Sequence, residues 1–170
     1  MRDSLTLYKL IILFMLERVD FPLTTNQISE FILEKEYTNY FTIQQALNEL
    51  LDSGLIRKDA MRGTTYYRNT QEGKSTLSYF KDRIPQAIVD DIVSYLKEKQ
   101  YQLKNEVSVL ADYYRTTSQD YEVCCQVKEG DSELIRLTLT VPDESSASSI
   151  CNNWEKKSSS IYAYLMEQLL

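Results

Sequence analysis

The hydrophobic residues in the first third of the chain recur with the spacing of amphipathic helices. The clearest apolar stripe consists of Ile43, Leu47, Leu50 and Leu51. It predicts a helix that ends at Gly54, because glycine accepts the left-handed conformation common at helix ends. Similar stripes predict helices over 4–19 and about 25–36. The first of these is apolar nearly all round, so we expect a dimer partner or a second domain to cover it.

After the third helix the pattern changes to short extended runs. Residues 55–59 and 65–69 predict the two strands of a hairpin. Its tip is Met61-Arg62-Gly63, where the glycine provides the backbone freedom of a tight turn. A further helix is expected from Thr70 to Arg83. The first part of the chain therefore reads as three helices, a two-stranded hairpin and a fourth helix.

The second half of the chain begins at Ile84-Pro85, because proline disfavours helix in the residue before it. A helix is expected over 86–102 and another over 144–169. Between them, period-two alternation predicts strands over 106–115, 121–128 and 134–141. The short connections favour antiparallel pairing. The prediction is an α+β protein with two domains, 1–83 and 84–170, the second being a small antiparallel three-stranded sheet flanked by two helices.

Composition excludes several classes of function. Histidine is absent, which removes the commonest general base and metal ligand, and no Gly-rich phosphate loop occurs. We therefore expect no enzyme activity, no cofactor and no metal. The three cysteines, without a secretory leader, indicate a reducing cytoplasmic location. The apolar run 10–16 is too short to span a membrane.

Charge is unevenly distributed along the chain. The net charge is −6, yet residues 1–83 hold 11 Lys/Arg and 11 Asp/Glu, while residues 84–170 hold 8 and 14. From Arg57 to Arg83 there are seven basic residues against three acidic ones. An excess of cations is what contact with nucleic-acid phosphates requires. The acidic second half is expected to have a different partner.

The polar face of the third helix is unusual because it is largely uncharged. It carries Tyr40, Thr42, Gln44, Gln45 and Asn48. Solvated helix faces usually carry Lys and Glu, whereas amides and hydroxyls can bond to base edges. We interpret this as a recognition helix, with either Thr38 or Asn39 as its N-cap.

The order of these elements resembles a winged helix-turn-helix domain of the MarR- and PadR-like bacterial transcription regulators. The resemblance is carried by Thr25-x-x-Ile28-Ser29, Ile43-x-x-x-Leu47-x-x-Leu50, Ser53-Gly54-Leu55-Ile56 and Tyr67…Thr70-x-Glu72-Gly73. The whole layout is also similar to a winged-helix family of unknown activity from low-GC Gram-positive bacteria with a small α+β C-terminal domain. The resemblance implies a regulator that binds double-stranded DNA as a homodimer through the third helix and the wing.

The residues expected to contact DNA are Thr38, Asn39, Tyr40, Thr42, Gln44, Gln45, Asn48, Arg57, Lys58, Arg62 and Arg68. The alternative is a protein-interaction module whose winged helix docks a protein partner. The tyrosines of the second half could line a pocket for a small-molecule effector, although such residues more often fill a core or an interface. Cys124 and Cys125 are more often inert strand cysteines than a redox switch.

Overall fold

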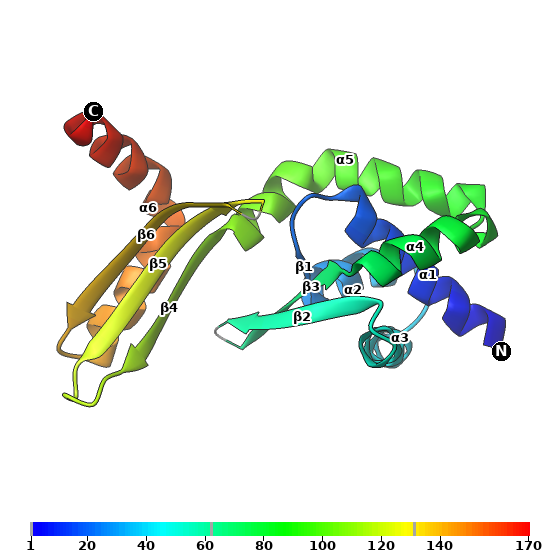
Figure 1. The fold of residues 1–170 in the computed structure, drawn as a ribbon, viewed down its shortest axis with the longest axis horizontal. Helices are drawn as coiled ribbons and strands as arrows, with labels where there is room; N and C mark the ends of the chain where they lie inside the picture. Colours follow the sequence, from blue (N-terminus) through cyan, green and yellow to red (C-terminus); the bar gives the residue numbers. More distant parts are fainter. Residues whose placement is uncertain (1, 62, 131) are drawn as a thin grey trace. The chain divides into compact units, whose positions relative to one another are not determined.

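The computed structural model describes residues 2–61, 63–130 and 132–170 of the 170-residue chain. Within these residues it is α+β, with six α-helices, one 3-10 helix and two three-stranded antiparallel sheets (Figure 1). The chain forms two compact units, Met1–Lys104 and Asn105–Leu170. No helix in the described ranges has the length and apolar character needed to cross a bilayer.

The first unit contains all elements up to Lys104, four residues before the end of the fifth helix. They are α1 (Arg2–Arg18), β1 (Leu23–Thr24), α2 (Thr25–Glu34), α3 (Tyr40–Asp52), β2 (Ile56–Met61), β3 (Thr64–Asn69), α4 (Gln71–Phe80), η1 (Lys81–Arg83) and α5 (Gln86–Ser108). The short strand β1 was not predicted. It pairs with β3, so the sheet has the order β1-β3-β2.

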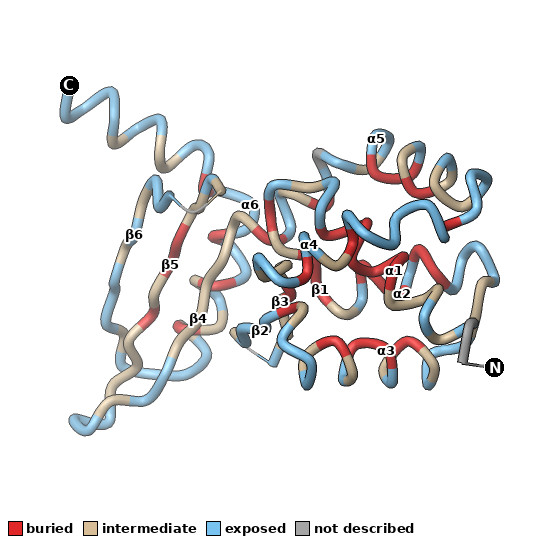
Figure 2. The backbone as a smooth tube through the Cα atoms, turned by 45° about the vertical axis from the view of Figure 1, so that its right-hand side comes forward, coloured by how far each residue is buried: buried red, intermediate tan, exposed pale blue. Residues whose placement is uncertain are grey.

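Helix α1 forms the centre of this unit. Every residue from Leu10 to Leu16 is buried. The covering elements include α3, α4 and β3 of the same unit. In Figure 2 the buried positions of α1 and of the inner side of α3 are drawn in red. The expectation that a dimer partner or a second domain covers α1 is therefore wrong. A helix apolar on all sides is buried here because its own unit wraps around it.

Local capping sets the ends of α2 and α3. Thr24 caps α2 in a capping box with Gln27, and Asn39 caps α3. Each helix then ends in a Schellman motif, in which the chain turns through one residue of positive φ. That residue is Gly54 after α3 (φ 72) and Glu36 after α2 (φ 56).

Helix α5 belongs to the first unit for most of its length. The hydroxyl of Tyr37, before α3, donates to Asp91 Oδ2 at 2.5 Å. The rings of Phe31 and Tyr95 lie 4.8 Å apart, and Gln27 Nε2 donates to the carbonyl of Leu103 at 3.3 Å. The boundary between the two compact units therefore falls after Lys104 along the chain, whereas the sequence predicted a boundary at Ile84-Pro85. Proline there interrupts the helix but not the packing.

The second unit is a three-stranded sheet with one long helix on one face (Figure 1). The sheet has the order β4-β5-β6, from β4 (Val109–Arg115), β5 (Tyr121–Glu129) and β6 (Ser132–Val141). Residues 106–108, predicted as strand, are helical because α5 runs on to Ser108. The last helix, α6 (Glu144–Leu169), has the predicted bounds.

The core of this unit forms between β5 and the first half of α6. Trp154 is buried, and its indole Nε1 donates to the carbonyl of Gln126 at 3.1 Å. Cys125 faces this core, and burial raises the pKa of its thiol to about 11. The neighbouring Cys124 is half-buried on the other face of the strand. A thiol with a raised pKa is a weak nucleophile at neutral pH.

The tyrosines considered for an effector pocket do not share one surface. Tyr113 and Tyr121 pack edge to face on the α6 side of the sheet, with ring centroids 6.1 Å apart. Tyr114 follows Tyr113 on the strand and points to the opposite face. Tyr164 is 62% exposed on α6. The first two therefore serve the core.

Candidate functional site

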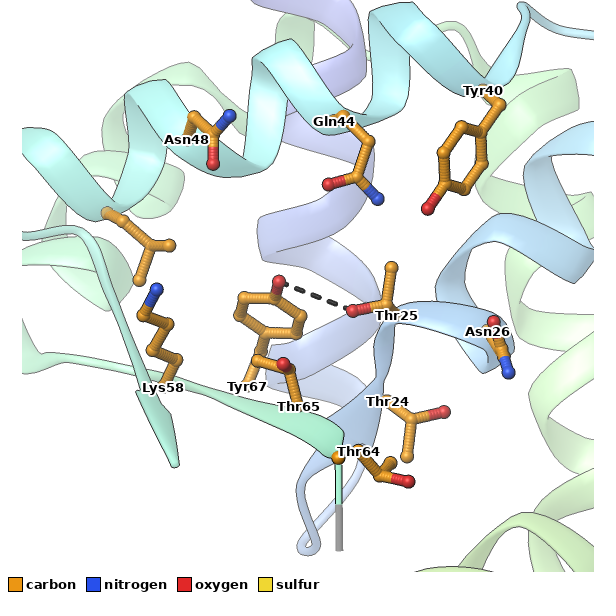
Figure 3. Close-up of a pocket in the computed structure, with 12 residues that line it drawn as sticks. Thr24, Thr25, Asn26, Tyr40, Gln44, Asn48, Lys58, Thr64, Thr65 and Tyr67 are labelled. Atoms are coloured by element: carbon orange, nitrogen blue, oxygen red, sulfur yellow. Dashed lines mark hydrogen bonds between the residues drawn. The ribbon is translucent and has the colours of Figure 1, made fainter. Parts of the chain in front are cut away.

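A groove of about 430 Å³ opens between the start of α2, one side of α3 and the β2–β3 hairpin (Figure 3). We call it the polar groove. It is lined by Thr24, Thr25 and Asn26 of the α2 end, Tyr40, Gln44, Asn48 and Leu51 of α3, and Lys58, Gly63, Thr64, Thr65 and Tyr67 of the hairpin. Among these described residues Lys58 carries the one charge. Hydroxyl and amide groups make up most of the rest.

Helix α3 contributes one of its sides to the groove. Tyr40, Gln44 and Asn48 follow each other at intervals of four residues, so their side chains lie along one side of the helix. The adjoining side, which includes Ile43 and Leu47, is fully buried against the core. The core therefore fixes the rotation of α3, and Figure 3 shows the three polar side chains directed toward α2 and the hairpin.

Strand alternation decides which basic residues of the hairpin reach the groove. Lys58 and Tyr67 are direct partners across the β2–β3 ladder and share a face. Arg57 and Arg68 are also direct partners, but on the opposite face. The structure therefore brings Lys58 to the groove and separates it from these two arginines. Arg62 at the hairpin tip lies outside the described residues.

The floor of the groove joins the hairpin to α2. Tyr67 is 5% exposed, and Thr25 Oγ1 donates to its phenolic oxygen at 3.3 Å, the dashed line in Figure 3. Thr25 is also the first residue of α2, a helix end that carries partial positive charge. Thr25 and Tyr67 were not predicted as site residues. The signal for Tyr67 is its position directly opposite Lys58 in the pairing of β2 with β3.

Three predicted residues before and at the start of α3 lie outside the groove lining. The side-chain oxygen of Asn39 accepts from the backbone N–H of Thr42 at 3.0 Å and from its hydroxyl at 3.2 Å. These two side chains therefore serve the helix cap. Thr38 is half-buried in the preceding turn.

A second surface of α3 points away from the core and beside the groove. We call it the outer face, and it contains Phe41 and Gln45, four residues apart. Gln45 Nε2 donates to Glu49 Oε1 at 3.3 Å, and Glu49 pairs with Lys9 of α1. Phe41 is 83% exposed and was not predicted as a site residue. Its position one turn before Gln45 was the signal available.

The chemistry of these surfaces is that of hydrogen bonding. The groove offers hydroxyl and amide donors, one ammonium group and the positive end of a helix, which together suit phosphate oxygens. No trio of His, Cys, Asp or Glu in the described ranges is placed to hold a metal ion.

The fold and the groove define an α+β protein in which a helix and a hairpin of the first unit present a polar surface with a single charged residue, Lys58, among its described lining. The chain belongs to the family described as Domain of unknown function (DUF4364), whose model matches residues 8–169. No curated protein matches the chain, and no solved structure matches it.

Proposed function

We propose that the first unit is a winged helix-turn-helix domain that binds double-stranded DNA, and that the protein is a homodimeric transcription regulator. In this proposal α3 is the recognition helix and the β2–β3 hairpin is the wing. Helix α3 contacts base edges while the polar groove receives a backbone phosphate.

One observation carries the proposal: the polar groove combines the start of α2, Lys58 and a set of hydroxyls and amides without an acidic residue among its described lining. Protein–DNA interfaces make most of their hydrogen bonds to phosphate oxygens, through Lys, Thr, Asn, Gln and Tyr side chains and helix N-termini. The groove contains each of these donor types. The outer face of α3 lies next to it, where bases would be reached.

Charge argues for a dimer. Residues 1–104 hold 14 basic and 14 acidic residues, and Asp52 at the end of α3 is exposed. A neutral unit gains little non-specific attraction to DNA, so one copy binds weakly. Two linked copies on two half-sites bind far more tightly. The exposed apolar end of α6 supports association through the second unit.

Fluorescence anisotropy of the full chain on a labelled random duplex, at low and rising salt, tests DNA binding. We expect Lys58→Gln to weaken binding to all sequences and to lower the slope of log affinity against log salt by about one. Lys97→Gln is the matched control. Lys97 is exposed on α5. In Figures 1 and 2 this helix lies on the side of the unit away from α3.

The proposal fails if the native chain does not bind duplex DNA at low salt. It also fails if Lys58→Gln and Lys97→Gln have equal effects.

The alternative function, docking of a protein partner by the same unit, is favoured by one observation. Phe41 and Tyr40 form an exposed aromatic pair, 83% and 48% accessible, with ring centroids 6.5 Å apart. Such a pair is typical of protein interfaces.

A further inference from the structure

The amide of Gln45 is held in one orientation. Its neighbour Glu49 is a carboxylate, which can only accept, so the NH2 group of Gln45 must face it. Glu49 is itself held by Lys9 from α1, and this contact lowers the pKa of the Glu49 carboxyl. Glu49 therefore stays ionised at neutral pH and keeps accepting. The three side chains form a relay from α1 to the outer face of α3.

The relay decides which groups Gln45 can offer a ligand. Nε2 carries two protons, and one of them is engaged by Glu49. What remains outward is one N–H donor and the Oε1 acceptor. In the major groove adenine presents one acceptor, N7, and one donor, the 6-amino group, whereas guanine presents two acceptors. The held amide matches adenine and would set Oε1 against an acceptor of guanine.

Phe41 adds an apolar contact beside this amide. Its ring is 83% exposed, and it lies one turn before Gln45 on the same face. Four residues of helix rise about 6 Å, which is under two base-pair steps of about 3.4 Å. The apolar group that a major groove offers to a phenyl ring is the C5-methyl of thymine.

We propose, resting on the proposed function above, that the outer face of α3 selects A·T pairs. Gln45, positioned by Lys9 and Glu49, forms hydrogen bonds with adenine. Phe41 contacts the methyl group of a neighbouring thymine. Lys9 and Glu49 act through Gln45 and are positioning residues. Phe41 and Gln45 determine specificity.

Selection of bound duplexes from a random-sequence library, followed by sequencing, provides the test. We expect the native full chain to enrich an A·T pair beside a second one. Glu49→Gln releases the amide of Gln45, because a neutral amide can donate as well as accept, and it should admit G at the adenine position, which the native protein disfavours at least about fivefold. Lys9→Met leaves the Glu49 carboxylate as an acceptor but removes the cation that positions it, so it should admit G to a smaller extent. Glu34→Gln, an exposed change elsewhere on the unit, should leave the enriched sequence unchanged.

The methyl contact is tested with the unaltered protein. Replacing the selected thymines by uracil removes only the methyl groups, and we expect affinity to fall about fourfold for each methyl contact. Phe41→Ala should bind the thymine and uracil duplexes equally. Because Phe41 is exposed, this variant is expected to fold normally.

The outcomes separate this inference from the proposed function. If no duplex is bound, the proposed function itself fails. If duplexes are bound but uracil has no effect, or the relay variants keep the native profile, the A·T inference is wrong while DNA binding stands.

Discussion

The carbonyl oxygen of Leu55 packs against the backbone of Gly73, so that a Cβ on Gly73 would lie 2.0 Å from it. The same turn is held by Thr70, whose backbone N–H donates to the Leu55 oxygen at 3.1 Å and whose hydroxyl donates to the carbonyl of Gly54 at 2.7 Å. Thr70 also caps α4 by accepting from the N–H of Gly73 at 3.1 Å. These contacts join the segment after α3 to the start of α4 at the base of the hairpin.

We expect Gly73→Ala to destabilise the first unit by about 1–3 kcal/mol, because the added methyl meets backbone rather than a movable side chain. The free energy of unfolding in urea, followed by circular dichroism, measures this. Ser75→Ala on the exposed side of α4 is the control and should change stability by less than about 0.5 kcal/mol. Similar values for both substitutions contradict the packing described.

The ends of α2 and α3 provide a second, paired prediction. Glu36 and Gly54 occupy the same position of the same motif, with φ 56 and 72. A left-handed conformation costs a residue with a Cβ about 1–2 kcal/mol. Glu36→Gly should therefore raise the free energy of unfolding and Gly54→Ala should lower it, each by about 1 kcal/mol. Nothing lies within 4 Å of a Cβ on Gly54, so sterics do not confuse the result. Changes of the same sign in both variants are incompatible with this account.

The Tyr37–Asp91 contact predicts a dependence on alkaline pH. Burial, and then the hydrogen bond to Asp91, raise the pKa of Tyr37 well above its ordinary value of 10.0. The folded chain then keeps a proton that the unfolded chain releases above about pH 10. The stabilisation is complete below that pH and decreases as pH rises further. The difference in free energy of unfolding between the native chain and Tyr37→Phe should shrink from pH 8 to pH 11. A constant difference contradicts the prediction.

The end of α6 predicts self-association. Ile161 and Leu165 are only partly buried there, and Leu169, on the same side of the helix, is 77% exposed. Leu165→Glu with Leu169→Glu should convert a dimer to a monomer in sedimentation velocity, because buried carboxylates without partners are costly. Lys156→Gln with Lys157→Gln changes the net charge equally on exposed positions of the same helix and should leave the dimer intact. A native chain that sediments as a monomer refutes homodimerisation.

Most of the elements could be predicted from the sequence, because each depends on interactions between residues close along the chain. The bounds 144–169 of the last helix are confirmed, as are a helix that ends at Gly54 and an antiparallel three-stranded sheet in the second half. Hydrophobic period, caps and a positive-φ glycine are local signals. The limits of α5 were less accurate, since Glu106–Ser108 alternate like a strand yet continue a helix.

What the tertiary structure decided is which side chains meet. Lys58 and Arg57 are neighbours in sequence, yet β3 pairing puts Lys58 with Tyr67 in the polar groove and Arg57 on the other face. The covering of α1 and the attachment of α5 through Tyr37 and Asp91 likewise join residues far apart along the chain. Local sequence determines the elements because their hydrogen bonds are local. Their surfaces combine only through packing of the whole unit, which no short stretch of sequence encodes.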